Sequence, residues 1–279
     1  MSKINKPKNQ LLRFFLLTYL IFWVLFGITG FSIMVLKAPK FIQYILPVIC
    51  SWSPTFAFLL MFKKLYPGLK LKEFIKQQFS TRVKISLLII IILIQTAIFL
   101  AVSFSYSIVN NVAITSVIAS SANVLILGFF DMLIRGPLGE EIGWRGYSLN
   151  EMQKKYSPVT ASIIIGVIWG FWHTPLWVVT SGYSGLDLVK YMALFLISII
   201  AVSVIITAFY NLNKNLLIPI LIHQLLNFLA SLILTDTLKA FYYMAPLYVI
   251  AALVLLVINP KKVLYGAKRV NIGEMNREM

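Results

Sequence analysis

Three groups of polar residues interrupt a largely apolar chain, and each holds side chains that can move protons or stabilise negative charge. The first group reads Gly139-Glu140-Glu141-Ile142-Gly143-Trp144-Arg145-Gly146. In a helix, Glu141 and Arg145 are i,i+4 neighbours in the order that favours pairing, whereas Glu140 points about 100° away. An unpaired carboxylate in an apolar site can act as a general base or acid. The alternative is a plain ion-pair cluster at a helix end.

The second group reads Trp169-Gly170-Phe171-Trp172-His173-Thr174-Pro175. Trp169 and His173 share one helix face, and small Gly166 and Gly170 allow a neighbouring helix to approach closely. Pro175 interrupts the hydrogen-bond ladder just after the histidine. The alternative is a core histidine that is bonded to a backbone carbonyl.

The third group reads His223-Gln224-Leu225-Leu226-Asn227. His223 and Asn227 are again i,i+4 neighbours, so both side chains project from one face. An imidazole and an amide can both donate hydrogen bonds, and two aimed donors are what an oxyanion hole requires. The alternative is a hydrogen-bonded pair between helices, worth about 1 kcal/mol.

The order and spacing of the three groups resemble the CAAX-protease and bacteriocin-processing family. The shared pattern is Glu-Glu-x-x-x-Arg, then aromatic-x-x-x-His, then His-x-x-x-Asn, within about residues 120–227. That family includes CAAX prenyl endopeptidases and bacterial self-immunity proteins. One departure is Trp169, because the family's second motif usually begins with Phe.

The resemblance implies a role for each matching residue. Glu140 would activate the attacking water and His173 would assist it, while His223 and Asn227 would stabilise the oxyanion. Glu141 and Arg145 would support the site structurally, as would the aromatic Trp169.

It is also open whether this chemistry uses a metal. Glu140, His173 and His223 could together ligate Zn²⁺. The chain has no closely spaced histidine pair, and Asn227 suits an oxyanion donor better than a zinc ligand. We expect a glutamate-activated water with no required cofactor, with zinc as the alternative.

The elements that position these residues must be membrane helices. Of the 279 residues, 59% are hydrophobic and 12% are charged, whereas soluble domains are about one quarter charged. Ionisable side chains inside such a bundle are costly and are functional candidates by default. Cys50 lies alone in an apolar run, which excludes a disulfide within the chain and favours a small core residue.

The net charge of +16 does not indicate a nucleic-acid partner, because Lys and Arg cluster beside apolar runs. A membrane span needs about 20 mostly apolar residues. The sequence predicts eight: Phe14–Leu36, Phe41–Phe62, Ile85–Val109, Val112–Ile134, Val159–Thr180, Val189–Phe209, Leu216–Leu234 and Ala240–Ile258.

Basic residues gather at the N-terminus (Lys3, Lys6, Lys8), in loops 63–84 and 145–155, at Lys214 and after Asn259. This distribution predicts that both termini are cytoplasmic. The short 37–40 loop does not fit this pattern, because it carries two lysines on the side predicted to be external. Apolar residues at helical spacing in the 63–84 segment predict an amphipathic helix on the cytoplasmic face.

The sequence therefore predicts one all-α integral membrane domain over 1–279, a multi-pass cell-membrane protein with a catalytic core at 120–230. We expect a polar cavity that opens toward the cytoplasm, where a peptide bond of a peptide or membrane-anchored protein is hydrolysed. The substrate could be CAAX-like or bacteriocin-related. The alternatives are a non-catalytic bacteriocin self-immunity protein and a transporter that uses the polar residues as a relay.

Overall fold

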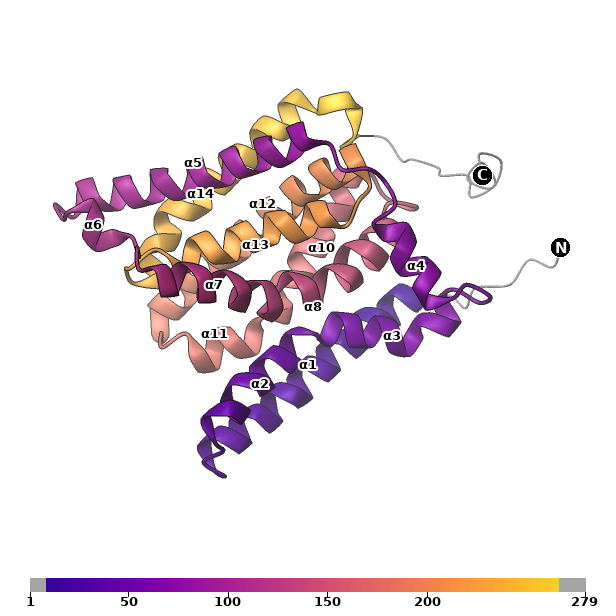
Figure 1. The fold of residues 1–279 in the computed structure, drawn as a ribbon, viewed down its shortest axis with the longest axis horizontal. Helices are drawn as coiled ribbons and strands as arrows, with labels where there is room; N and C mark the ends of the chain where they lie inside the picture. Colours follow the sequence, from indigo (N-terminus) through magenta and orange to yellow (C-terminus); the bar gives the residue numbers. More distant parts are fainter. Residues whose placement is uncertain (1–8, 266–279) are drawn as a thin grey trace.

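The computed structural model describes residues 9–265, and helices dominate it (Figure 1). The predicted basic cluster at Lys3, Lys6 and Lys8 and the tail beyond Tyr265 lie outside the described residues. The elements are α1 (Gln10–Met34), α2 (Lys40–Ser51), α3 (Ser53–Leu65), α4 (Leu71–Gln78), α5 (Ile85–Val109), α6 (Ile114–Val117), α7 (Ala122–Arg135), α8 (Pro137–Glu141), the π-helix η1 (Ile142–Leu149), α9 (Asn150–Met152), α10 (Pro158–Trp172), α11 (Thr174–Thr180), α12 (Gly185–Asn213), α13 (Leu217–Ser231), α14 (Thr237–Ile258) and the 3-10 helix η2 (Pro260–Lys262).

The described residues confirm a membrane helix bundle. Six helical stretches between residues 9 and 265 are long and apolar enough to cross a membrane, and α2 with α3 forms a seventh if this pair, bent by 52°, is one span. The remaining predicted segment contains α13, which has only 15 residues. Each of the eight predicted segments therefore contains helix, although α13 is shorter than a straight span needs.

The fourth predicted span, Val112–Ile134, is wrong at both ends. A helical stretch runs from Ala122 to Met152, so the Glu-Glu group lies within the span and most of the predicted 145–155 loop is helix. Gly136 and Pro137 kink this stretch without ending it, because proline is compatible with the first turn of α8. The helix then changes from α to the π-helix η1, and π-helical turns of this kind often occur at functional sites.

Close packing in the bundle depends on small residues, as the second group predicted. Helix α12 packs extensively against α10 on one side and α14 on the other. A Cβ atom at Gly166 would lie 2.8 Å from the Ile200 Cα atom, and one at Gly170 would lie 2.5 Å from the Leu196 Cδ1 atom. Helices α1, α2 and α3 form a separate group beside this centre (Figure 1).

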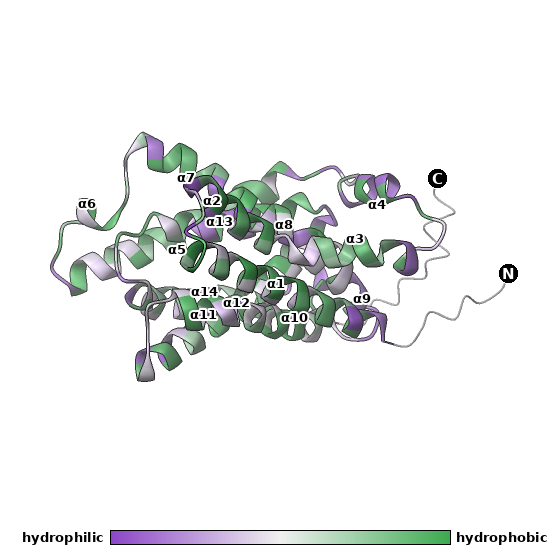
Figure 2. Ribbon diagram, turned by 90° about the horizontal axis from the view of Figure 1, so that it is seen from below, coloured by the Kyte–Doolittle hydropathy of each residue, from purple (hydrophilic) through white to green (hydrophobic). Residues whose placement is uncertain are grey.

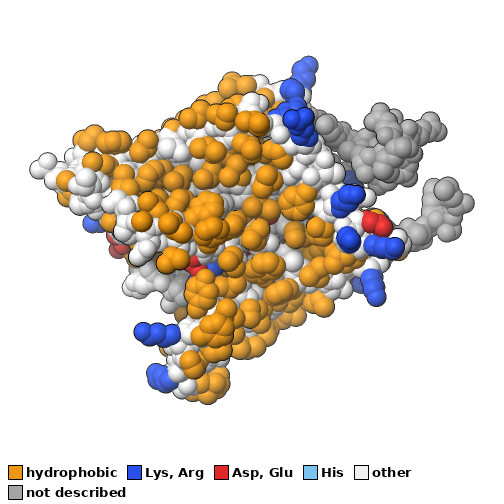
Figure 3. Space-filling view, viewed as in Figure 1, with side chains coloured by type: hydrophobic (Ala, Val, Ile, Leu, Met, Phe, Trp, Pro, Cys, Tyr) orange, Lys and Arg blue, Asp and Glu red, His pale blue; other side chains and the backbone are white. Residues whose placement is uncertain are grey.

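The two ends of the described chain lie at the same end of the bundle, together with α4 (Figures 1 and 2). Figure 2 shows apolar residues along the helices and hydrophilic ones concentrated near α4. Lys and Arg side chains gather at this end in Figure 3, with a smaller group at the far end. This arrangement is consistent with the predicted orientation, in which the basic end is cytoplasmic.

The amphipathic segment at 63–84 contains the predicted helix, α4. Its Phe74 side chain is 3% exposed and packs against Phe58, Phe62 and Tyr66, with ring centroids 4.9–5.7 Å apart. Leu71 and Lys72 remain exposed. Protein contacts therefore hold α4 in place, and its contact with a bilayer surface stays a prediction.

Candidate active site

Glu141 lies at the centre of a buried ionic cluster. Its Oε1 atom accepts a hydrogen bond from Arg145 Nη1 at 2.9 Å and another from His223 Nδ1 at 2.8 Å. The Glu141 and Arg145 side chains are both 0% exposed. The predicted Glu141–Arg145 pair is confirmed, and it joins α8 to the π-helix η1. The contact between Glu141 and His223, which brings in α13, was not predicted.

Glu140 occupies a different environment from its neighbour. It is 3% exposed and belongs to none of the ion pairs found among residues 9–265. Its Oε2 atom accepts a hydrogen bond from Trp169 Nε1 at 2.7 Å. The helix geometry thus separates the two adjacent glutamates, as predicted: one is neutralised by Arg145 and the other is held by a neutral donor.

Trp169, the first residue of the second group, contacts residues of the first and third groups. Its indole N–H donates to Glu140, and its ring lies 4.2 Å from the Arg145 guanidinium carbon. A buried guanidinium over an indole face is stabilised by a cation–π interaction. The His223 ring packs edge-on against the same indole, with centroids 5.0 Å apart. Trp169 therefore fixes both the free carboxylate and the ionic cluster, which explains why an aromatic residue suits this position.

His173 lies at the C-cap of α10, and the next helix, α11, begins at Thr174 with Pro175 in its first turn. Its Nδ1 atom lies 2.8 Å from the backbone carbonyl oxygen of Trp169. Because a carbonyl can only accept, Nδ1 carries the hydrogen, and Nε2 of the neutral ring is left as an acceptor. The backbone-bonded histidine, which was the alternative prediction, is therefore observed, and the same ring also lines a cavity.

His223 and Asn227 project from one face of α13 toward Gly136, which confirms the shared face. A Cβ atom at Gly136 would lie 2.7 Å from Asn227 Nδ2 and 3.3 Å from His223 Nε2. A glycine at the kink between α7 and α8 is therefore what allows both nitrogens to approach this backbone. With Nδ1 held by Glu141, Nε2 is the ring atom of His223 that remains for other partners.

Trp169 and His223 meet although they lie at different distances from the starts of their helices. Trp169 lies about 16 Å along α10 from Pro158, and His223 about 9 Å along α13 from Leu217. The side chain of Asn215 donates to the carbonyl oxygens of Phe79 and Thr81, which fixes the start of α13. The contact between the two rings shows that His223 is level with Trp169, one turn from His173.

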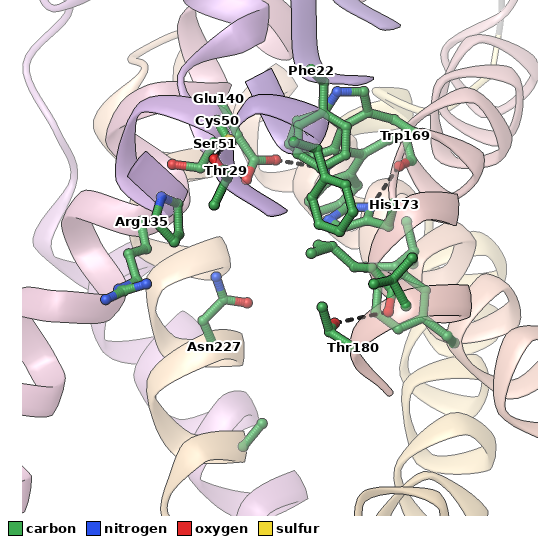
Figure 4. A pocket seen from close by; sticks show the side chains of 18 of the residues that line it. Phe22, Thr29, Cys50, Ser51, Arg135, Glu140, Trp169, His173, Thr180 and Asn227 are labelled. Carbon is green, nitrogen blue, oxygen red and sulfur yellow. Dashed lines mark hydrogen bonds between the residues drawn. The ribbon is translucent and has the colours of Figure 1, made fainter. Parts of the chain in front are cut away.

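The candidate residues line a cavity of about 680 Å³. Figure 4 shows Glu140, His173 and Asn227 on different sides of it, on α8, at the end of α10 and on α13. Its walls are largely apolar, and they include Phe22, Phe26, Ile33, Met34, Leu176, Val179, Phe195, Ile199, Leu226, Phe241 and Met244.

The direction of the cavity differs from the prediction. Helix α1 lines it from Phe22 to Met34, its last residue, and α11 contributes its own last residue, Thr180. Both helices end away from the basic end. Toward the basic end lie buried aromatic side chains, with Trp144 and Tyr147 in ring contact with Phe14. The cavity is therefore mostly apolar rather than polar as predicted, and it extends away from the basic end, which conflicts with an opening toward a cytoplasm at that end.

Sequence reasoning missed the cavity residues that come from the first two spans and from α7. Thr29 and Ser51 line the cavity, as do Cys50 and Arg135. Cys50 is 4% exposed and its sulfur lies 3.3 Å from Thr29 Oγ1, which confirms a buried core position. Small polar residues within apolar helices were the signal that could have identified this wall.

The donor atoms for a metal are suitable in kind but not in position. His223 and His173 each have Nδ1 anchored, which is how metal-binding imidazoles are usually oriented. Yet within residues 9–265 no three His, Cys, Asp or Glu side chains are grouped closely enough to hold a metal ion. The proposed set Glu140, His173 and His223 does not fit zinc in this arrangement, and we derive no step through a metal.

Fold and site together define a multi-pass membrane protein with carboxylate, imidazole and amide groups around an intramembrane cavity. Residues 121–229 match the family described as type II CAAX prenyl endopeptidase Rce1-like. The chain is 35% identical over 100 residues to CAAX prenyl protease 2 of Methanococcus maripaludis, an alignment that covers 34% of this chain and 37% of that relative. The chain thus matches little more than a third of the relative's length. These findings confirm the resemblance: the segment with all four candidate residues matches this family model.

Proposed function

We propose that this protein is an intramembrane endopeptidase that hydrolyses a peptide bond in a membrane-associated protein. The observation that carries the proposal is the environment of Glu140. This carboxylate is buried on the cavity wall and lies outside the ion pair that neutralises Glu141. A carboxylate without a cationic partner is free to accept a proton, which a general base requires.

In the proposed reaction, Glu140 accepts a proton from water as the water oxygen attacks the scissile carbonyl carbon. The carbonyl π bond opens and its electron pair forms an oxyanion on a tetrahedral intermediate. Collapse of this intermediate breaks the C–N bond, and Glu140 returns the proton to the leaving amine. One water is consumed and Glu140 ends as it began, so the cycle needs no other reactant.

The other candidate residues have complementary roles in this proposal. His173, with Nδ1–H on the Trp169 carbonyl, offers Nε2 to orient the attacking water. The Asn227 amide and the Nε2 atom of a protonated His223 donate to the oxyanion. The carboxylate of Glu141 at 2.8 Å supports the protonated ring of His223. Donors that are already in place when charge develops give most of the benefit of an oxyanion hole.

The cavity walls support a membrane-associated substrate. Apolar side chains dominate the lining, so a lipid anchor or an apolar peptide segment would be accommodated more readily than a charged loop. The name of the aligned relative refers to CAAX prenyl substrates. We propose a CAAX-like or bacteriocin-related chain as the substrate class, with hydrolysis that requires no metal.

The test compares the wild-type protein with Glu140→Gln, using Glu151→Gln as a control with the same chemical change. Glu151 is a partly exposed acid paired with Lys154 near the basic end. Purified protein in liposomes is given a prenylated peptide that ends in Cys-aliphatic-aliphatic-X. In parallel, peptides are compared between membranes of cells that express each variant.

Glu140→Gln should abolish cleavage in both assays while the protein stays folded, and Glu151→Gln should keep it. Full activity in the Glu140→Gln variant would refute the assigned base. If the wild type cleaves nothing in either assay but carries ion or solute flux across the same liposomes, the chain is a transporter rather than a peptidase.

A further inference from the structure

A second hollow lies on the other side of the bundle from the active-site cavity and shares no residue with it. It is an apolar groove of about 600 Å³ between α5, α12 and α14. We call it the lysine groove, because two lysines, Lys84 and Lys261, stand among its lining residues. The others are Ser86, Leu87, Ile90, Ile94, Phe209, Leu212, Ala251, Val254, Leu255, Ile258 and Pro260.

Lys84 is held at the start of α5 by the end of α12. Its backbone N–H donates to Asn213 Oδ1 at 2.9 Å, and Asn213 Nδ2 donates to the Arg82 carbonyl oxygen at 3.2 Å. Asn213 is 4% exposed, so this anchor is part of the packed structure. The Lys84 side chain itself is exposed and takes part in no ion pair within the described segment.

Lys261 is held at the groove by an unusual loop. Asn259, Lys261 and Lys262 have φ angles of 38°, 53° and 56°, a left-handed conformation that residues with a side chain rarely adopt. The loop is tied down where it ends, because Leu264 N donates to Asn259 Oδ1 at 3.0 Å and Leu264 is fully buried. Such strain persists only where the surrounding structure enforces it, and it often occurs at ligand-binding sites.

The groove and its lysines lie at the basic end of the bundle. Lys84 begins α5 and Lys261 follows α14, and Figure 3 shows Lys and Arg side chains above this corner of the molecule. An apolar groove that ends at two cations at the basic end of the bundle matches a molecule with an apolar chain and an anionic head. Anionic lipid headgroups bind basic pockets between membrane helices in this way.

We propose that the lysine groove binds an anionic phospholipid, with an acyl chain along α5, α12 and α14 and the phosphate between Lys84 and Lys261. A zwitterionic lipid would fill the same groove, but its own cationic group would oppose the two ammonium groups. The lipid bridges helices that are far apart in sequence, and it holds the end of α14 against α5.

The experiment measures lipid that stays bound to the full chain. Protein reconstituted in vesicles of equal parts phosphatidylcholine and phosphatidylglycerol is extracted into mild detergent, and retained lipid is identified by mass spectrometry. The variants are Lys84→Gln/Lys261→Gln, the matched control Lys63→Gln/Lys64→Gln at the same end of the bundle, and Ala251→Trp, which fills the groove without a charge change. Size-exclusion elution and thermal unfolding verify that each variant is folded.

We expect the wild type and the Lys63→Gln/Lys64→Gln control to retain phosphatidylglycerol in preference to phosphatidylcholine. The Lys84→Gln/Lys261→Gln variant should lose about 30-fold in apparent affinity, and Ala251→Trp should lose the lipid altogether. Equal loss in both double variants would mean unspecific surface attraction and would overturn the proposal. So would retention by a folded Ala251→Trp variant, or displacement of the lipid by inorganic phosphate alone.

Discussion

Replacing Glu141 by Gln tests how the ionic cluster supports the site. The substitution keeps the size of the side chain and removes its charge. Two groups depend on that charge, because Glu141 Oε1 accepts from Arg145 Nη1 at 2.9 Å and from His223 Nδ1 at 2.8 Å. Arg145 is 0% exposed, so its guanidinium cannot turn to water after the change.

The expected loss follows from that burial. Removing one partner of a buried ion pair costs about 3–5 kcal/mol, because the remaining charge is left uncompensated. For a chain of this size, that corresponds to a decrease of about 6–20 °C in the unfolding temperature. Replacing both partners by neutral groups, in Glu141→Gln/Arg145→Met, should recover much of the loss, since no guanidinium is left buried without its counter-charge.

The measurement is thermal unfolding of the purified protein in detergent. Glu151→Gln is the control, because it breaks a Glu–Lys contact whose side chains are 20% and 39% exposed and should cost no more than about 1 kcal/mol. An unfolding temperature for Glu141→Gln that equals that of Glu151→Gln would refute the reasoning. A double variant less stable than Glu141→Gln alone would refute it as well.

Four further predictions concern topology, the oxyanion donor, the kink and the metal. Reporters should read in, out, in, out and in when fused after Lys64, Asn110, Lys155, Gly185 and Lys261; an external C-terminus would contradict the orientation. Asn227→Ala should lower kcat by about 10²–10³ with a smaller change in KM, and a raised KM with unchanged kcat would assign Asn227 to binding instead. Gly136→Ala should lower kcat with less loss of stability than Glu141→Gln, since its Cβ would lie 2.7 Å from Asn227 Nδ2; unchanged kcat would contradict this. Exhaustive chelation should leave activity intact. The metal-free reaction would be refuted if the protein held stoichiometric zinc, if both the His173 and the His223 variants lost it, and if only added metal restored activity.

The active site and the lysine groove lie on different walls of one bundle, and α12 contributes to both. Ser198 and Ile199 of α12 line the active-site cavity, while Phe209 and Leu212 line the lysine groove. Loss of lipid binding and loss of peptidase activity are therefore separate outcomes. A protein that fails to cleave any peptide could still bind an anionic lipid.

Local spacing in the sequence was enough to predict the contacts within each helix. The pairing of Glu141 with Arg145 and the shared face of His223 and Asn227 depend only on the i,i+4 geometry of a helix, and both are observed. The apolar segments predicted the membrane class for a similar reason, because a span must satisfy its backbone internally. The fourth span was placed wrongly because the predicted segment ended at Ile134, whereas the helix continues past Gly136 and Pro137 into a π-helix.

The contacts between helices could not be predicted from the sequence. Nothing in the spacing indicated that Glu141 would hold His223, or that Trp169 would bond to Glu140, because these pairs are separated by 82 and 29 residues. The cavity's direction was missed for the same reason, since it depends on how the second half of α1 and the end of α11 face α13. Composition and local periodicity were enough to predict the membrane class, the apolar helices and the chemical groups of the site. Tertiary structure alone decided which groups meet, because one turn more or less at the start of a helix such as α13 moves a side chain by about 5 Å.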